Sequence, residues 1–328
     1  MTRQANLQIA ILGIGAMGCL FGSKLKDHAD IYVLGNWPEQ IEALRRDGLE
    51  VISPHGTSTH HRLNVTPDIK TVPASDVVLV LVKSYQTVRA ARQAAQILKP
   101  EGVAITLQNG LGNLEVLAQE VGPARAVMGV TAQGATVLGP GRLRHAGDGP
   151  THLARVTGQE PILSSISELF KRVGLATTLV DDADSLIWGK LAINAGINPL
   201  TALLKIPNGA LVEDDLLARI MAGAAQEVAQ IAAVRGIGLP YEDAAVRTAE
   251  VSRATAANRS SMLQDVDRGA PTEIDAISGA VVRAGAEAQV PTPINHFLWR
   301  LMKAQEAGQD RLNRQQFEKL ATQRLEIP

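Results

Sequence analysis

The sequence predicts an α/β fold in which a doubly wound parallel sheet is followed by a second, all-helical domain. Four short apolar segments alternate with helical segments in the first part of the chain, at residues 7–12, 30–34, 75–82 and 102–108. Each is almost continuously apolar and rich in Val, Ile and Leu, which is typical of parallel strands covered on both faces. After residue 181 the strand-like pattern ends, and long segments rich in Ala and Leu follow. We therefore expect one domain over residues 1–181 and a second over residues 182–328.

The end of the first domain has a different texture. Residues 126–156 contain frequent Gly and alternate between strand-forming and polar residues, which predicts an antiparallel meander that extends the sheet. A helix over residues 162–174 and a strand over 175–180 complete this domain.

Composition excludes several classes of function. The chain has 328 residues and a formal net charge of −1, so it lacks the basic surface that nucleic acids or anionic membranes require. Cys19 is the only cysteine, which excludes a disulfide within one chain and a thiolate metal site, and we expect no bound metal. The sequence has neither a signal-peptide core nor a run of about 18 apolar residues, so we expect a cytoplasmic protein that binds small molecules. The helical pattern fits a monomer or a homodimer equally well.

A glycine-rich bend follows the first predicted strand. In "ILGIGAMG" (11–18), Gly13, Gly15 and Gly18 form G-x-G-x-x-G between a strand and a helix. The first glycine permits the tight turn, the second lets the backbone approach a pyrophosphate, and the third lets the helix pack closely. This Rossmann-type context favours a dinucleotide site over a simple turn. Its residues are Gly13, Ile14, Gly15, Ala16, Met17 and Gly18.

The residues that follow the other predicted strands bear on whether the bound dinucleotide is NAD or NADP. NAD sites usually carry an acidic residue at the end of the second strand and NADP sites often carry an Arg, but Asn36 stands here. Asn36 is suited to bind a ribose hydroxyl or a phosphate, or simply to form a turn. Lys83 and Asn109 follow later strands, at the edge of the sheet where ligands bind. A solvated lysine and an Asn-Gly turn are the simpler alternatives.

The helix predicted over residues 186–204 carries a polar stripe. Lys190, Asn194 and Asn198 are spaced i, i+4 and i+8, whereas the other faces are apolar or glycine. Buried amines and amides need partners, so this stripe is expected to line a polar cavity, although a solvent-facing stripe is the alternative. Desolvation would lower the pKa of Lys190 and suit it to donate a proton. Pro199 predicts that the helix kinks or stops there and that Asn198 leaves the helical conformation.

Two further groups lie late in the chain. Asn258 and Ser261 are three residues apart and would share one face if this segment is helical. Thr272 and Asp275 resemble a capping box at the start of a helix. Glu273 would then be a first-turn acid that complements the helix dipole, unless it has a functional role.

Taken together, these residues resemble the ketopantoate reductase (2-dehydropantoate 2-reductase) family over almost the whole chain. The junction helix and the two late motifs are specific, whereas the glycine bend is generic. The matching motifs are "GIGAMG" (13–18), "KSYQT" (83–87), "QNGLG" (108–112), "WGKLAINAGINPLTAL" (188–203), "PNG" (207–209), "SSMLQD" (260–265) and "TEID" (272–275).

The resemblance implies a Rossmann domain joined to a helical domain like the C-terminal domain of 6-phosphogluconate dehydrogenase, with the active site in the cleft between them. It implies NADPH-dependent reduction of 2-dehydropantoate to (R)-pantoate, on the route to pantothenate and coenzyme A. Lys190 would be the general acid. Asn109 and Ala135 would hold the nicotinamide side of the cofactor, and Glu273 the cofactor and the catalytic geometry. The implied substrate-binding residues are Lys190, Asn194, Asn198, Asn208, Asn258 and Ser261.

The sequence departs from this family at Asn36, where members that use NADPH commonly carry an Arg that pairs with the 2′-phosphate. Lys83, which the family also uses there, is retained. NADPH remains favoured because no acidic residue repels the phosphate, and NAD is not excluded. Two alternatives are a reductase of another branched 2-oxo acid and a non-catalytic NAD(P)-binding redox sensor.

Overall fold

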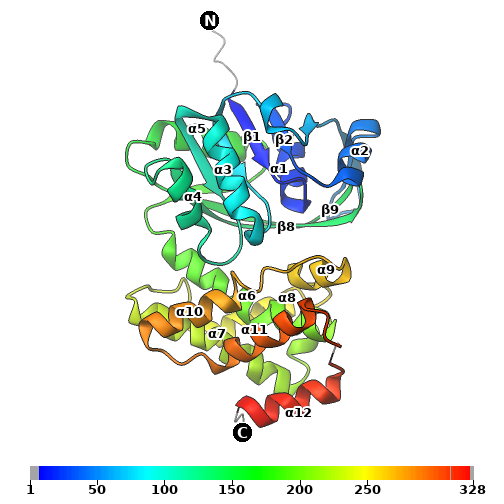
Figure 1. The fold of residues 1–328 in the computed structure, drawn as a ribbon, viewed down its shortest axis with the longest axis vertical. Coiled ribbons are helices and arrows are strands. Elements are labelled where there is room, and N and C mark those ends of the chain that lie inside the picture. The colour runs from blue at the N-terminus through cyan, green and yellow to red at the C-terminus, as the bar shows by residue number, and fades with distance from the viewer. Residues whose placement is uncertain (1–6, 311, 326–328) are drawn as a thin grey trace, which may run out of the picture. The chain divides into compact units, whose positions relative to one another are not determined.

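A computed structural model describes residues 7–310 and 312–325, and the chain divides into two compact units (Figure 1). The N-terminal unit contains the residues up to Gln108 together with Asn113–Ala183. The C-terminal unit contains the residues from Asp184 onward and, in addition, the short segment Asn109–Gly112.

The N-terminal unit is built on a sheet whose central strands are parallel. Neighbouring strands in this part follow the spatial order β5-β2-β1-β6-β7-β8. Their bounds are β1 Gln8–Leu12, β2 Asp30–Leu34, β5 Val65–Thr66, β6 Ser75–Val80, β7 Leu98–Thr106 and β8 Ala126–Gly139. Counted along the chain, this is the order 3-2-1-4-5-6 of the Rossmann fold, so the predicted fold class is confirmed.

Beyond β8 the sheet turns antiparallel, as predicted for residues 126–156. β8 pairs antiparallel with β9 (Arg142–Ala154), and β9 pairs in parallel with β10 (Thr177–Val180). β3 (Leu49–Ile52) pairs with the first residues of β9, on the same edge as β10 and opposite β8. β3 also forms an antiparallel hairpin with β4 (Ser58–His61). The sequence pattern did not predict this hairpin.

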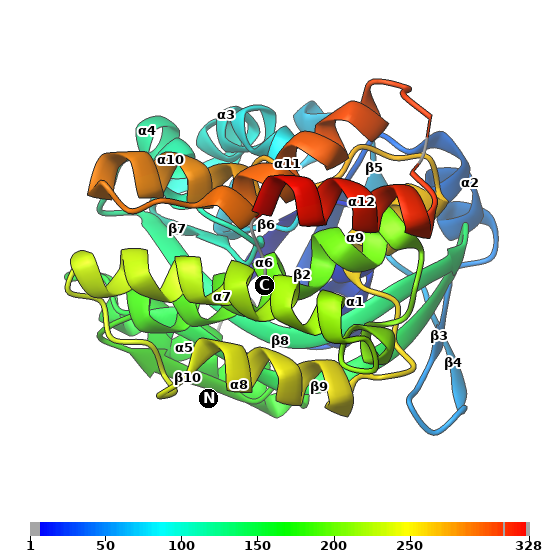
Figure 2. The same ribbon diagram turned by 90° about the horizontal axis from the view of Figure 1, so that it is seen from below.

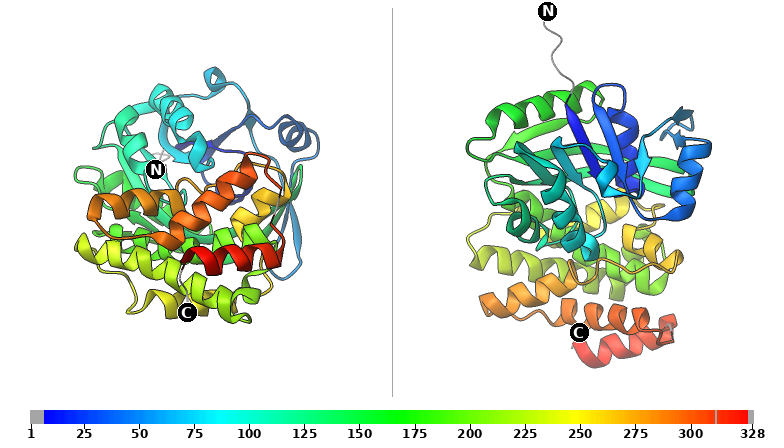
Figure 3. Two further views of the ribbon diagram at one scale, coloured as in Figure 1. Left: turned by 60° about the horizontal axis from the view of Figure 1, so that its bottom comes forward. Right: turned by 45° about the horizontal axis from the view of Figure 1, so that its top comes forward.

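Alternate strand residues face two separate apolar cores, so the sheet is covered on both sides (Figure 3). Ile9 and Ile11 of β1 enter one core with residues of α1, α2 and α5, whereas Ala10 and Leu12 enter the other with residues of α3 and α4. The helices are α1 Ala16–Leu25, α2 Pro38–Arg46, α3 Thr87–Ile97, α4 Asn113–Val121 and α5 Glu160–Arg172, with short 3-10 turns at Ile69–Thr71 and Ser84–Gln86. Burial on both faces explains why the strands read as continuous apolar runs.

The C-terminal unit is helical, and the long helix α6 (Asp184–Leu204) contacts α7, α8, α9 and α11. Figure 2 shows α7, α8 and α12 along their lengths. The other elements are the 3-10 turn η3 Asn208–Leu211 and the helices α7 Asp215–Val234, α8 Ala244–Ala254, α9 Ser261–Asp267, α10 Ser278–Ala288, α11 Pro293–Glu306 and α12 Arg314–Leu325. No helix among the described residues is long and apolar enough to cross a bilayer.

The prediction that the helix stops at Pro199 is wrong, and so is the prediction that Asn198 leaves the helical conformation. α6 continues through Pro199 to Leu204, and Asn198 is helical. The proline removes the N–H that would bond to the carbonyl oxygen of Ala195, which costs the helix one hydrogen bond. Residues 195–203 are all buried, so tertiary packing outweighs the local cost.

Two other local predictions also fail. Asn258 lies in the connection between α8 and α9, so it does not share a helix face with Ser261, the first residue of α9. α10 begins at Ser278 rather than at Thr272, because the backbone N–H and hydroxyl of Thr272 both donate to Glu306 of α11, at 2.8 and 2.7 Å. Residues 273–277 form turns, and Glu273 is not a first-turn acid.

Candidate functional site

The glycine bend has the steric features that a pyrophosphate site requires. Gly13 has φ +129°, and a Cβ there would lie 2.6 Å from the carbonyl oxygen of Leu81. A Cβ on Gly18 would lie 1.8 Å from the carbonyl oxygen of Gly13, so the third glycine lets α1 pack on the turn. A Cβ on Gly15 would meet nothing within 4 Å. Gly15 therefore leaves open space at the N-terminus of α1, which fits an approaching phosphate.

Buried hydrogen bonds from neighbouring side chains hold the backbone of this bend in place. Within it, Gln40 Nε2 donates to the Ile14 carbonyl oxygen at 3.3 Å, and Gln40 Oε1 accepts from the N–H of Gly141 at 2.8 Å. The thiol of Cys19 also donates to the Ile14 carbonyl oxygen, at 3.3 Å. Burial raises the pKa of Cys19 to about 12, so this thiol acts in packing rather than as a nucleophile. The polar Gln40 was not predicted, since nothing in its local sequence marks it as buried.

Asn36 is exposed and borders a hollow of about 700 Å³ beside α2. The hollow is also lined by Arg45, whose guanidinium donates to the carbonyl oxygen of Val65 at 3.1 Å, and by Arg46, which pairs with Asp47 at 2.8 Å. Arg46 is thus balanced by a carboxylate. Arg45 supplies the cationic character of this hollow, at the end of the second strand where Rossmann folds bind the adenosine ribose.

The remaining cofactor candidates of the N-terminal unit are Lys83 and Ala135. Lys83 is partly buried and immediately precedes the 3-10 turn Ser84–Gln86, beyond the carboxyl end of β6. Ala135 lies in the antiparallel part of β8, opposite His145 of β9, and is partly buried against the apolar core.

Three predicted residues from distant parts of the sequence assemble within the C-terminal unit. Lys190 is partly buried on α6, and burial lowers its pKa to about 8 against the opposing effect of the negative charge of Glu273. Glu273 is only 5% exposed, and it accepts a hydrogen bond from Asn109 Nδ2 at 3.3 Å. An amine, a carboxylate and an amide thus form one polar cluster.

Segment Asn109–Gly112 reaches this cluster because Gly110 can approach another backbone closely. Gly110 has φ +83°, and a Cβ there would lie 2.2 Å from the carbonyl oxygen of Ala276. The N–H of Leu111 donates to that same oxygen at 3.0 Å. Asn109 is therefore fixed against the turns that carry Glu273.

The polar stripe of α6 continues toward the candidate substrate residues. Asn194 is partly buried and Asn198 is 6% exposed. Thr201, one turn further along α6, donates to the hydroxyl of Ser260 at 2.7 Å, which ties α6 to the start of α9 and hence to Ser261. Thr201 and Ser260 were not predicted, although both lie within the motifs that carried the family resemblance.

Asn208 and Asn258 are joined by backbone rather than by side chain. The N–H of Asn208 donates to the carbonyl oxygen of Asn258 at 3.0 Å, while the Asn258 side chain is exposed. Asn208 Nδ2 donates to Thr255 Oγ1 at 2.9 Å, but the buried Asn208 Oδ1 has no hydrogen-bond partner among the described residues. A buried acceptor without a donor is costly and fits a site that a ligand hydroxyl would complete.

Comparison with known proteins decides the family. Residues 9–158 match the model described as ketopantoate reductase PanE/ApbA, and residues 182–306 match the model of its C-terminal domain. The chain belongs to the ketopantoate reductase family. A 2-dehydropantoate 2-reductase of Halobacterium salinarum is 36% identical over 300 residues, covering 90% of this chain and 98% of the relative.

Solved structures of ketopantoate reductases and of a related dehydrogenase share this fold. The 2-dehydropantoate 2-reductase of Geobacter metallireducens is 27% identical with a TM-score of 0.84, covering 91% of this chain and 100% of that chain. A D-mandelate dehydrogenase, solved with NADH and anilino(oxo)acetate, is 25% identical with a TM-score of 0.84, covering 92% of this chain and 98% of that chain. The family to which this chain belongs thus consists of oxidoreductases whose structural relatives include an NADH-bound enzyme.

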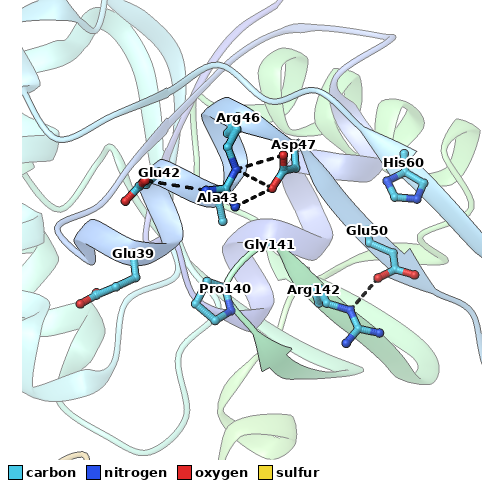
Figure 4. A pocket seen from close by; sticks show the side chains of 11 residues that line it. Glu39, Glu42, Ala43, Arg46, Asp47, Glu50, His60, Pro140, Gly141 and Arg142 are labelled. Carbon is cyan, nitrogen blue, oxygen red and sulfur yellow. Dashed lines mark hydrogen bonds and ion pairs between the residues drawn. The ribbon is translucent and has the colours of Figure 1, made fainter.

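A second hollow shares Glu42 and Arg46 of α2 with the hollow beside Asn36. It has a volume of about 420 Å³ and is lined by α2 and by residues of β3, β4 and the β8–β9 turn (Figure 4). Its arginines are paired within the protein, Arg46 with Asp47 and Arg142 with Glu50 at 2.7 Å. These pairs leave little unbalanced charge for a ligand. In the described part of the chain, no group of three or more His, Cys, Asp or Glu side chains could hold a metal ion.

The open space at Gly15 gives the first testable expectation. Gly15→Ala should weaken the binding of a nicotinamide dinucleotide by about tenfold or more, because the added methyl group would occupy space that the phosphates need. Folding stability should fall by about 1 kcal/mol, since Ala is a much poorer N-cap than Gly, and this loss is too small to unfold the protein. Fluorescence titration and thermal unfolding measure the two effects.

Gly22→Ala in the same helix is the matched control, since its Cβ would meet only ordinary contacts at 3.4 Å. Unchanged affinity in Gly15→Ala would place the cofactor elsewhere.

Proposed function

We propose that the protein catalyses the NADPH-dependent reduction of 2-dehydropantoate to (R)-pantoate, with Lys190 as general acid. The observation that carries this proposal is the placement of Lys190. Its pKa is lowered to about 8 by burial, and Glu273 lies close enough to act on it electrostatically. Membership of the ketopantoate reductase family and the named 2-dehydropantoate 2-reductase relatives support the choice of substrate.

The proposed chemistry needs one hydride and one proton. The bound nicotinamide would supply the hydride to the C2 carbonyl carbon of the substrate. Lys190 would donate a proton from Nζ to the carbonyl oxygen, which converts the ketone to a secondary alcohol and leaves a neutral amine. A pKa near 8 suits this role, because the amine is protonated at neutral pH and its neutral form is favoured by burial. Glu273 would keep the resting amine charged.

The neighbouring polar residues offer complementary groups to the substrate. We assign Asn194, Asn198 and Ser261 as donors to its carboxylate. Asn208 Oδ1 is a buried acceptor without a partner among the described residues, so it would accept the hydrogen of the substrate's primary hydroxyl. Asn258, whose backbone holds Asn208, contributes to the shape of this pocket.

For the cofactor, we propose NADPH over NADH. Arg45 borders the hollow beside Asn36, Lys83 follows β6, and no acidic residue ends the second strand. A phosphate contact to a cation is stronger than one to a neutral amide, so the absence of an Arg at position 36 reduces this preference. Asn109, Ala135 and Glu273 would complete the nicotinamide side.

A second candidate is the reduction of a different 2-oxo acid. The similarity to D-mandelate dehydrogenase bound to NADH and anilino(oxo)acetate favours it, since that structural relative covers most of the chain. Steady-state assays with 2-dehydropantoate and phenylglyoxylate, each with NADPH and with NADH, separate the candidates. Oxidation of neither cofactor with any 2-oxo acid, despite cofactor binding, would instead identify a redox sensor.

Removal of the proposed acid should affect chemistry rather than binding. Lys190→Ala is expected to lower kcat by about 10²–10⁴-fold, the range for a positioned acid, with little change in the Kd of NADPH. Rapid-mixing kinetics and fluorescence titration measure the two quantities. Lys171→Ala, which removes an exposed lysine from α5, should have no effect on either. Turnover of Lys190→Ala near the unsubstituted level would show that another group is the acid.

The pH dependence follows from the same group. Because Lys190 must be protonated to act, kcat/KM for reduction should be level below pH 8 and fall about tenfold per pH unit above its pKa of about 8. The measurement is kcat/KM between pH 6 and about 10. A level profile across this whole range would exclude Lys190 as the acid.

Cofactor preference can be tested at Asn36. Asn36→Arg should raise the ratio of NADPH to NADH affinity by about tenfold, because the new cation would pair with the 2′-phosphate. Asn36→Ala is the control that removes the amide without adding charge. Titration of both cofactors gives the ratio, and an unchanged ratio in Asn36→Arg would show that position 36 does not face the phosphate.

A further inference from the structure

One face of α11 is bonded to the turns that carry Glu273. Trp299, Lys303 and Glu306 are spaced i, i+4 and i+7, so they lie on one side of the helix. Each of them bonds to a residue that flanks Glu273 in the sequence, either Thr272 or Asp275. None of these three residues belongs to the candidate cofactor-binding, substrate-binding or catalytic residues described above.

The contacts on the two flanks are as follows. Before Glu273, Thr272 donates its N–H and its hydroxyl to Glu306 Oε1, at 2.8 and 2.7 Å. After it, Trp299 Nε1 donates to Asp275 Oδ1 at 2.7 Å, and Lys303 Nζ donates to Asp275 Oδ2 at 2.9 Å. Lys303 also donates to Glu306 Oε2 at 3.0 Å, which links the two flanks.

These bonds matter because Glu273 is held where a carboxylate is unfavourable. Glu273 is 5% exposed, and the hydrogen bond from Asn109 is long at 3.3 Å. A buried carboxylate gains hydration when it moves to water, so its backbone has to be held for the side chain to stay. Residues 273–277 form turns rather than a helix, and the flanking bonds supply that restraint.

We propose that Lys303 and Glu306 are positioning residues that hold the 272–275 turn and thereby keep Glu273 beside Lys190. The charge of Glu273 raises the pKa of Lys190 against the effect of burial. Loss of the restraint lets Glu273 move away from Lys190. The pKa of Lys190 then falls below the value of about 8 that it has in the unsubstituted protein. The amine loses its proton at a lower pH, so less of the acid is charged at neutral pH.

Arg283 adds to this restraint, because its guanidinium donates to the backbone carbonyl oxygen of Asp275 at 2.8 Å. Lys303 and Asp275 are 43% and 57% exposed, so their ion pair alone contributes little. It is the sum of bonds on both flanks that fixes the turn.

The test measures the pKa of Lys190 without using catalysis. The amine is labelled with acetic anhydride over a range of pH in the full chain, and mass spectrometry follows the extent of reaction at Lys190. Lys303→Met and Glu306→Ala should each lower this pKa by at least about 0.5, in the same direction as Glu273→Gln. The upper limb of the pH profile of kcat/KM should move to lower pH by the same amount.

Two variants serve as controls. Arg300→Met removes a positive charge from the same helix at an exposed position, so it matches the charge change of Lys303→Met without touching the turn. Lys303→Arg preserves a cationic donor and should restore the pKa of Lys190. Thermal unfolding of each variant separates a local change from a loss of folding.

The results test the positioning role and the proposed function separately. The effect on kcat/KM rests on the proposed function, whereas the effect on the pKa of Lys190 does not. An unshifted Lys190 pKa in both Lys303→Met and Glu306→Ala overturns the inference. The same holds if Arg300→Met shifts it equally, or if Glu273→Gln leaves it unchanged. A shift with the expected pattern, in a protein that reduces no 2-oxo acid, supports the positioning role and refutes the proposed function.

Discussion

The burial of one lysine amine on α6 is the constraint on which the candidate site depends. α6 contacts four other helices of its unit, because almost every residue around Lys190, Asn194 and Asn198 is apolar or small. Such surroundings make a charged amine costly, which lowers its pKa to about 8. The amine therefore needs a nearby carboxylate, and Glu273 in turn needs a donor and a fixed backbone. Asn109, Gly110 and the turns before α10 meet these needs.

The glycine bend illustrates a different kind of constraint, set by space rather than charge. Gly13 and Gly18 are required by close backbone approaches within the protein, whereas Gly15 has free space around its missing side chain. The same three-glycine pattern thus combines two packing positions with one position that leaves open space at the start of α1. The buried Gln40 and Cys19 hold the carbonyl oxygen of Ile14 between them, so the bend is fixed before any cofactor binds.

Features with a strong local signature were predictable from the sequence. The parallel strands appear as apolar runs because both faces are covered, and the stripe of α6 appears at helical spacing. Predictions failed where distant partners overrule local preference. Pro199 does not end α6, because residues 195–203 are all buried and their packing outweighs the loss of one hydrogen bond. Thr272 does not begin a helix, because Glu306 takes its two donors. Nothing near Thr272 in the sequence identifies a partner on α11, and the hairpin of β3 and β4 likewise depends on pairing with β9.

The segment Asn109–Gly112 has a consequence for the modularity of this chain. These four residues follow a strand of the N-terminal unit, yet they pack with the C-terminal unit and supply its hydrogen bond to Glu273. The helical unit is therefore discontinuous in sequence, and no single uninterrupted stretch of the gene encodes all of it. A fragment that begins at Asp184 would leave the carbonyl oxygen of Ala276 without the N–H of Leu111. Such a fragment would be an incomplete unit, because four of the residues that complete its packing are encoded between β7 and α4.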